Sequence, residues 1–590
     1  MKYPVLPTQN RSRDIVDVFK GYNHNLRISD GEFYDMQNMT SDYYPVLSPR
    51  GKRGVYASPE IANGLIAKDA LCYVDGENFV INGNTVRMGL TDSEKTLISM
   101  GAYVIIMPDK KYINTENLTD FGNIEATFTT TTAVKFSLCR QDASLYTVDY
   151  IQATEPTEPA NMALWIDTSA TPHSLKQWSE TNGMWVSIAT TYVKIESAGI
   201  GKAFEAYDGV TISGLDGTIF DSVSGDPVEA PDIRKLNGNA VIWAKGEDYI
   251  VVVGILDAVR SISNPVTVSR LMPNMDFIIE RENRLWGCRY GQARNGEIVN
   301  EIYASKLGDF KNWNCFMGIS TDSYAASVGT DGAFTGAINH LGYPLFFKEN
   351  CVHKVYGSFP ANFQIQDTAL RGVQKGCEKS MAIVNEVLYY KARHAVCAYD
   401  GSLPTEVSYA FGDKRYCEAV GAAHGNKYYI SMKDTEGYHL FVYDTAKGMW
   451  HREDHFHADD MCSCGDELYA IDHDTGKIVT MLGSGTQDTK DVEWMVETGE
   501  LMLSSPDMKY ISRLTVRLSL DIGTTVEFYA RYDLSSEWVK IAYIQGTSLR
   551  SISVPIRPRR CDHMKLRIVG KGPGKIYSIT KTIEQGSELS

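Results

Sequence analysis

The 590-residue sequence contains no long hydrophobic run. A helix that crosses a bilayer needs about 20 consecutive apolar residues, and no stretch of that kind is present. The first residues, MKYPVLPTQNRSRD, also lack the apolar core of a secretory signal. We therefore expect no membrane-spanning segment and a protein made in the cytosol.

Cysteine is scattered and odd in number. The chain has 11 cysteines, and the closest pair, Cys462 and Cys464, has a single residue between them and no second pair at metal-binding spacing. This pattern favours buried free thiols made in a reducing compartment over a disulfide framework.

The common catalytic motifs are missing as well. The sequence has neither the G-x-S-x-G elbow nor the H-E-x-x-H helix. The segment GKGPGK (570–575) precedes a strand and lacks the Ser or Thr of a phosphate-binding loop, and DHDTGK (472–477) lacks the closing Glu of a calcium loop and is typical of a hairpin turn. Carboxylate pairs for sugar cleavage depend on folding and stay open. We expect a protein that is not an enzyme and has no cofactor and no bound metal.

One run is rich in metal-ligating residues. HREDHFHADD (451–460) contains His451, His455 and His457 with three aspartates. Imidazole and carboxylate groups could hold a transition metal, but no second ligand cluster follows at a defined spacing. We favour a polar loop between blades with exposed histidines.

The stretch Asp276 to Phe316 carries the strongest structural signal. Its apolar runs FII, LWGCRY and EIVNEIYAS are separated by polar or glycine-bearing corners, ERENR among them, which is typical of strands joined by hairpins. The same outline recurs downstream at 339–357, 378–401, 421–454 and 465–482, and upstream at 70–90 and 95–114. A repeat of this length indicates a β-propeller, here of about seven blades.

Two further regions interrupt or follow the repeat. A Thr-rich, Trp-containing region separates the early units from the later ones, and the tail has clean period-2 strands that fit a β-sandwich. We predict an all-β protein with an N-terminal arm at 1–62, first propeller blades at 63–123, inserted β modules at 124–262, remaining blades at 263–487 and a C-terminal β-sandwich at 488–590.

Three tryptophans gather in the inserted region. Trp165, Trp178 and Trp185 lie within 164–188 and could form a face that stacks on a glycan or contacts a partner. Small β domains also use tryptophan as core, and we favour that interpretation.

Charge is divided unevenly along the chain. From Ser505 to Ser590 there are 14 Lys and Arg against 8 Asp and Glu, a net charge of +6, so the other residues carry −21 of the total −15. Such a body is unsuited to coating nucleic acid over its whole surface. The residues that could contact DNA or a neighbouring subunit are Arg513, Arg517, Arg557, Arg559 and Arg560, although a solvated strand face explains them equally well.

Several phrases resemble one known family. GEFYDMQNMTSDYYPVLSPRGKRG, ENRLWGC, NEIYASKLGDFKNWN and FFKENCVHKVYG, with the strand-rich tail, resemble bacteriophage tail hub or nozzle proteins, the packaged-DNA stabilisation proteins of short-tailed phages. The inserted modules depart from the simplest pattern of that family.

The resemblance implies a structural virion protein of the phage tail, assembled in the host cytoplasm. It implies a homo-oligomeric ring of about six copies, a hexamer, below the portal and its adaptor, with tail fibres or other tail proteins as further partners. The ring would retain packaged double-stranded DNA and conduct it during infection. Two alternatives stay open: a receptor-binding or baseplate-type propeller that recognises host-surface glycan through the tryptophan module, and a propeller glycan hydrolase or lyase.

Overall fold

The protein is almost entirely β-structure. The computed structural model describes residues 11–292, 296–484, 486–487, 490–502 and 508–585. Within these ranges the one α-helix is α1 (Pro231–Arg234), and the 3-10 turns are η1 (Ile200–Lys202), η2 (Pro360–Asn362), η3 (Glu378–Ser380) and η4 (Tyr409–Phe411). No helix of this part is long and apolar enough to cross a membrane. The predicted all-β class is confirmed.

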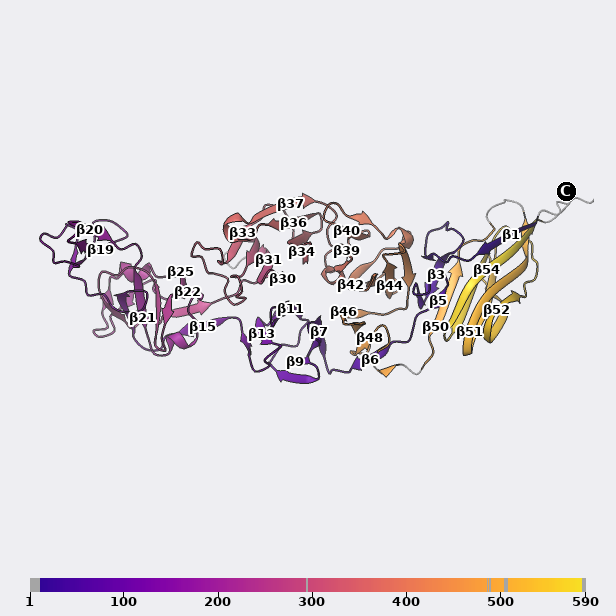
Figure 1. Ribbon diagram of the computed structural model, residues 1–590, viewed down its shortest axis with the longest axis horizontal. Helices are drawn as coiled ribbons and strands as arrows, with labels where there is room; N and C mark the ends of the chain where they lie inside the picture. The colour runs from indigo at the N-terminus through magenta and orange to yellow at the C-terminus, as the bar shows by residue number, and fades with distance from the viewer. Residues whose placement is uncertain (1–10, 293–295, 485, 488–489, 503–507, 586–590) are drawn as a thin grey trace, which may run out of the picture.

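A seven-bladed β-propeller occupies the middle of the molecule (Figure 1). In the first six blades the strands run from the inner to the outer position in chain order, and in the seventh the outer position is taken by β6. The first blade contains β7 (Ala62–Ala67), β8 (Leu71–Asp75), β9 (Asn78–Ile81) and β10 (Asn84–Arg87), and the second contains β11 (Thr96–Met100), β12 (Tyr103–Met107), β13 (Lys111–Asn114) and β14 (Phe121–Asn123). The third blade contains β30 (Phe277–Arg281), β31 (Arg284–Gln292), β32 (Ile298–Ala304) and β33 (Tyr324–Ser327), the fourth β34 (Phe334–His340), β35 (Tyr343–Lys348), β36 (Cys351–Tyr356) and β37 (Gln364–Ala369), and the fifth β38 (Ala382–Val384), β39 (Val387–Lys391), β40 (Val396–Tyr399) and β41 (Thr405–Glu406). The sixth blade contains β42 (Cys417–His424), β43 (Lys427–Lys433), β44 (Tyr438–Asp444) and β45 (Met449–Arg452), and the seventh β46 (Ala458–Cys464), β47 (Glu467–Asp472), β48 (Ile478–Thr480) and β6 (Gly54–Ala57).

The ring is closed by strands from opposite ends of the propeller sequence. Inner strands contact their neighbours around the circle, with η3 between β34 and β42, and β46 touches β7 where the circle closes. The outer strand of the last blade, β6, comes from the N-terminal region and pairs with β48, Ile478 opposite Ala57; β49 (Thr486–Gln487) also pairs with β6. Radial closure of this kind leaves few exposed sheet edges.

The repeat at Asp276 to Phe316 forms the first three strands of the third blade, and the fourth strand, β33, begins at Tyr324, beyond the predicted end. Between β30 and β31, Glu282 and Asn283 both have positive φ, 49° and 58°, as the two central residues of a type I′ hairpin turn require. The local pattern of apolar runs and corners therefore defines the strands correctly.

The insert between the second and third blades has its own core. Its first strand, β15 (Ala126–Thr129), pairs with its last, β29 (Thr267–Arg270), so the insert runs to Arg270, past the boundary at 262 suggested by the sequence. Its other strands are β16 (Val134–Cys139), β17 (Tyr150–Gln152), β18 (Leu164–Asp167), β19 (Ser174–Ser179), β20 (Met184–Ser187), β21 (Tyr192–Glu196), β22 (Gly209–Ser213), β23 (Ile219–Phe220), β24 (Pro227–Val228), β25 (Gly238–Val241), β26 (Ala244–Lys245), β27 (Tyr249–Val253) and β28 (Arg260–Ile262).

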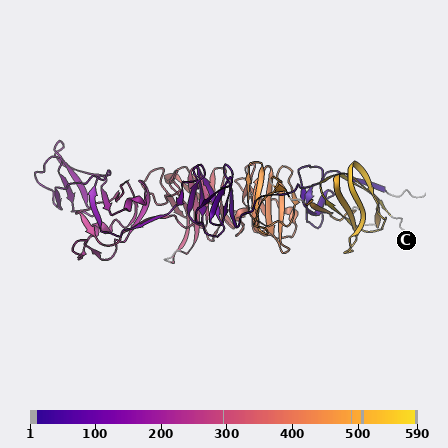
Figure 2. The same ribbon diagram turned by 90° about the horizontal axis from the view of Figure 1, so that it is seen from below.

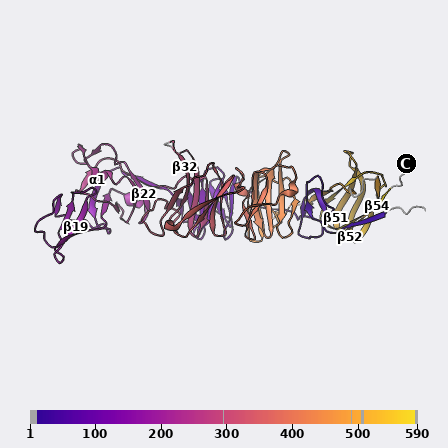
Figure 3. The same ribbon diagram turned by 90° about the horizontal axis from the view of Figure 1, so that it is seen from above.

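The C-terminal sandwich is built on one long strand. β51 (Lys509–Tyr532) pairs along its first half with β54 (Gly574–Gln585) and along its second half with β53 (Met564–Lys571), while β52 (Val539–Val554) follows it along both halves. β50 (Glu493–Thr498) pairs with β53, and β1 (Arg11–Val16) adds to the edge at β54. The insert and the sandwich lie on opposite sides of the propeller, so the molecule is elongated in all three views (Figures 1, 2 and 3).

The N-terminal region joins the sandwich to the propeller through a continuous sheet. β2 (Gly21–Tyr22) pairs with β45 of the sixth blade and with β3 (Glu32–Gln37), which in turn pairs with β50 of the sandwich. A short hairpin, β4 (Met39–Thr40) with β5 (Ser48–Pro49), precedes β6. Gly21 is required here, because its φ is +83° and a Cβ would lie 2.3 Å from the Trp450 carbonyl oxygen. The region that the sequence left as an arm is thus an integral part of both domains.

Partly buried charges connect the two sides of this joint. Arg53 donates to Glu453 at 2.7 Å and to Asp454 at 2.8 Å, and Arg50 donates to Asp454 at 3.1 Å. Burial by itself raises the pKa of the Asp454 carboxyl, but the charges of Arg53 and Arg50 outweigh it and lower that pKa. We name these four side chains, Arg50, Arg53, Glu453 and Asp454, the joint cluster.

Removing one charge from the joint cluster should destabilise the protein strongly. Arg53→Met leaves Asp454 and Glu453 partly unpaired in a buried site, and we expect a loss of about 3–5 kcal/mol in the free energy of unfolding. The matched control is Arg87→Met, which breaks an exposed ion pair with Glu77 and should cost less than about 1 kcal/mol. Urea unfolding of both variants measures the difference, and equal losses would contradict the assignment.

Candidate functional site

The propeller axis holds a polar cavity in two adjoining parts. The parts have volumes of about 380 Å³ and 390 Å³ and share Glu94, Glu378, Lys379 and Asp460. Their walls come from the beginnings of inner strands of several blades, β7, β11, β30, β42 and β46 among them. Successive blades thus place side chains that are remote in sequence around one hollow.

Lys379 lies at the centre of the shared region. Its ammonium pairs with Glu94 at 2.6 Å and donates to the Asp459 backbone oxygen at 2.8 Å. Burial lowers the pKa of Lys379, but Asp460 and Glu94 outweigh burial and raise it. The lysine therefore stays charged among carboxylates.

Asp460 is the most deeply placed of these carboxylates. It accepts the backbone N–H groups of Leu65 and Met461, each at 2.9 Å. Burial nevertheless raises the pKa of Asp460, and the charge of Lys379 only partly opposes that effect. A buried carboxyl with a raised pKa beside an ammonium in a cavity marks this place as a candidate functional site.

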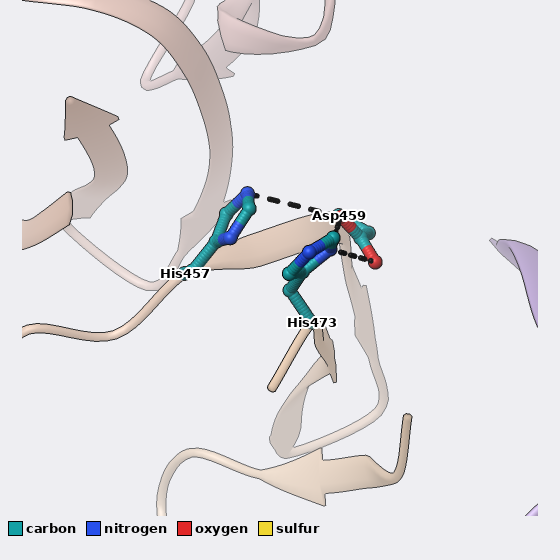
Figure 4. Close-up of side chains that lie close together, drawn as sticks. All are labelled: His457, Asp459 and His473. Carbon is teal, nitrogen blue, oxygen red and sulfur yellow. Dashed lines mark hydrogen bonds and ion pairs between the residues drawn. The ribbon is translucent and has the colours of Figure 1, made fainter. Parts of the chain in front are cut away.

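A second cluster lies at the rim of the cavity (Figure 4). The His473 Nδ1 atom is 2.8 Å from Asp459 Oδ1, and His457 Nε2 is 3.9 Å from the same oxygen. The imidazole rings of His457 and His473 are 4.0 Å apart, and the ring of Tyr438 stacks on His457 at 3.4 Å. Burial lowers the pKa of His457, and His473 lowers it further.

The histidine-rich run is divided among three places. His457 and Asp459 reach the rim, Asp460 reaches the cavity, and Asp454 belongs to the joint cluster. The expectation of exposed histidines is wrong for His451, which is 4% exposed because β45 continues through it; burial lowers the pKa of His451 to about 4. DHDTGK does form the turn between β47 and β48, where Thr475 donates to Asp472 at 2.6 Å.

The three tryptophans meet on one sheet of the insert. Trp185 lies 5.3 Å from Trp165 and 5.5 Å from Trp178 between ring centroids. Trp165 is 3% exposed and donates to the Gln152 carbonyl at 2.9 Å, while the other two are half-buried. Trp165 therefore packs, and Trp178 and Trp185 retain accessible surface.

The basic residues divide between a strand and a loop. Arg513 and Arg517 are exposed on β51, and Arg13 on β1 faces Thr582, the residue opposite Arg513. Arg557, Arg559 and Arg560 are exposed in the segment after β52, where the Arg559 guanidinium lies 5.3 Å from the Tyr532 ring. Sequence reasoning missed Arg13, because its place beside β54 follows from pairing across the whole chain.

Comparison with known proteins gives no family. No family model matches the sequence, and no curated protein matches it. Among solved structures, an exo-β-1,3-galactanase from Phanerochaete chrysosporium aligns at 10% identity over 52% of this chain and 94% of its own, with a TM-score of 0.21. A family 43 arabinoxylan arabinofuranohydrolase from Bacillus subtilis aligns at 10% identity over 53% and 95%, with a TM-score of 0.18. The extracellular domain of a candidate one-component system from B. thetaiotaomicron aligns at 10% identity over 90% and 92%, with a TM-score of 0.24.

These neighbours correct one expectation from the sequence. The prediction that the chain is not an enzyme rested on missing motifs, and glycoside hydrolases of family 43 are among the structures that align with it. Missing motifs do not exclude activity for a site assembled from several blades, and that prediction is withdrawn. TM-scores this low assign neither a substrate nor a catalytic residue.

Lys379 should control the protonation of Asp460. In Lys379→Met the Asp460 carboxyl loses its neighbouring cation, and its pKa should rise further. A carboxyl whose pKa is higher in the folded than in the unfolded state destabilises the fold when ionised. The penalty of the variant should therefore be largest, about 3 kcal/mol, near neutral pH and shrink toward pH 5.

Urea unfolding at the two pH values tests this expectation. Lys375→Met, which removes an exposed lysine on the same segment, serves as the control and should show little effect at either pH. A penalty for Lys379→Met that is independent of pH would refute the coupling.

Proposed function

We propose that this chain is a structural protein of a bacteriophage tail, a ring-forming hub or nozzle subunit that retains and conducts DNA below the portal and adaptor. The observation that carries the proposal is the uneven charge of an elongated subunit. Residues 124–270 contain 10 Lys and Arg against 18 Asp and Glu, a net charge of −8, whereas residues 488–590, which form the sandwich, contain 15 Lys and Arg against 13 Asp and Glu, a net charge of +2. Because the insert and the sandwich lie on opposite sides of the propeller, the two ends differ in sign.

The basic end suits docking to an acidic partner. Arg13, Arg513 and Arg517 lie on strands whose register places them near one another on one face of the sandwich. Complementary charge steers association and fixes orientation. In this proposal the sandwich faces the portal–adaptor complex or a neighbouring copy, and the insert points away from it toward fibres or other tail proteins.

The acidic remainder suits contact with moving DNA. Cationic side chains hold phosphates by releasing counterions, whereas an acidic wall repels them and allows sliding. A net charge of −21 outside residues 505–590 agrees with a passage that DNA crosses without being gripped.

The phrase that resembles phage tail proteins also has a structural role that fits this function. Residues 31–54 contain β3, the β4–β5 hairpin and both arginines of the joint cluster. A subunit that carries load during DNA release needs its domains fixed to one another, and this segment fixes them.

A second candidate function is recognition of host-surface glycan by the insert. The observation in its favour is the cluster of Trp165, Trp178 and Trp185 far from the sandwich, with a buried Trp185 indole N–H that has no hydrogen-bond partner among the described residues. A sugar ring could stack on the accessible faces of the half-buried Trp178 and Trp185 rings.

Native mass measurement and negative-stain imaging separate the two candidates. The wild-type protein should form a ring, alone or on the portal–adaptor complex of the same phage. Arg513→Glu with Arg517→Glu should abolish docking, and Arg87→Glu, a reversal on the propeller surface, should not. The tail-hub proposal would be contradicted, and the second candidate supported, if the protein did not bind the portal–adaptor complex but bound host cells, and if the binding to cells were lost in Trp178→Ala.

A further inference from the structure

The rim cluster brings metal-ligating groups together from two turns of the seventh blade. His457 and Asp459 stand at the beginning of β46, and His473 lies in the turn after β47 (Figure 4). A register shift between Ala458 and Asp460 marks a bulge at Asp459, and bulges re-aim side chains in this way. The His473 backbone N–H donates to the His457 carbonyl at 3.0 Å, so the two histidines are held side by side.

The donor atoms are spaced for a shared ion. One ligand atom from each of the three residues lies within 4.8 Å of the other two, and the separations from Asp459 Oδ1 are 2.8 Å to His473 and 3.9 Å to His457. A tetrahedral site with bonds of about 2.0–2.1 Å needs donor separations of about 3.3 Å. Small rotations of exposed side chains bring the observed distances to that value.

The surroundings hold one ligand in place and leave the others room to adjust. Tyr438 stacks on His457 with an angle of 11° between the ring planes, and the Tyr438 hydroxyl donates to Glu418. The side chains of Asp459 and His473 are 42% and 54% exposed. The stacked ring is already oriented, and the two exposed groups can close on an ion.

We propose that His457, Asp459 and His473 bind one divalent transition-metal ion of the zinc class, with a remaining coordination position open to water or an oxygen ligand at the mouth of the axial cavity. Two imidazoles favour zinc, copper or nickel over calcium and magnesium, which prefer oxygen ligands. Three protein ligands and an open position are the arrangement of zinc sites that bind a further ligand.

A second group of acidic residues and a histidine lies in the described part of the chain, but a lysine ammonium already occupies the place that a metal ion would take. Asp434, Glu436 and His439 also lie close together, yet the Lys414 ammonium pairs with Asp434 at 3.1 Å and with Glu436 at 3.2 Å. A cation is therefore present there, and this group serves as an internal comparison for the rim cluster.

Isothermal titration of the chelator-treated full chain with zinc chloride tests the proposal, with metal analysis for the stoichiometry. We expect one ion per chain at the rim cluster. His473→Ala and Asp459→Asn should each weaken binding by roughly 100-fold or more, since each removes a ligand. His394→Ala, which removes an exposed histidine from another blade, should bind as the wild type does.

Cobalt substitution gives a readout that does not depend on affinity. The wild type should show the visible absorption of a low-coordinate cobalt site, and His473→Ala should lose it while keeping the same thermal unfolding midpoint without metal. Three results would overturn the proposal: no stoichiometric zinc binding, unchanged binding in both ligand variants, or binding lost instead in His439→Ala or in Cys462→Ser with Cys464→Ser.

Discussion

The buried ion cluster of Arg50, Arg53, Glu453 and Asp454 is the interaction on which the arrangement of the molecule depends. It binds the segment before β6 to the end of the sixth blade. β6 then closes the seventh blade, while β3 on the other side of the cluster continues into the sandwich. One short stretch of chain therefore closes the ring and sets the position of the sandwich.

The strands that were predicted well are those whose signals are local. The runs around Glu282 and Asn283 alternate with turn residues, and each hairpin folds from neighbours in the sequence. β6 was missed because GVYA at 54–57 is a strand only through its pairing with β48, more than four hundred residues later. The axial cavity was missed for the same reason, because Lys379 meets Glu94 across the propeller axis. The rim cluster is local, since His473 meets Asp459 across the β46–β47 hairpin, but that contact depends on the register of the hairpin and on the bulge at Asp459. The histidine run was recognised, but its meeting with His473 of DHDTGK follows from the strand register and the bulge at Asp459, which only the fold defines.

The polar axis and the opposed charges of the two ends describe different properties of the same subunit. The charges of the insert and of the sandwich concern assembly, because complementary charged surfaces orient binding partners. The axis bears on ligand binding, because a raised carboxyl pKa beside an ammonium and a histidine–aspartate–histidine group both lie in or at the mouth of one cavity. The two features lie in different parts of the subunit, so the proposed assembly at its ends and the proposed metal binding at its axis can be tested separately.

Native-state hydrogen exchange over residues 31–57 tests the central claim most directly, because that claim makes this segment part of the folded core. The Asn38 backbone N–H donates to the Glu453 carbonyl and the Arg50 N–H to the Asn38 carbonyl, each at 2.9 Å. We expect these amides to exchange as slowly as those of the inner blade strands, and we expect protection to fall in the propeller and the sandwich together when the joint opens. Rapid exchange at 31–57 with the blades still protected would mean that the segment is a loose arm, and would contradict the account.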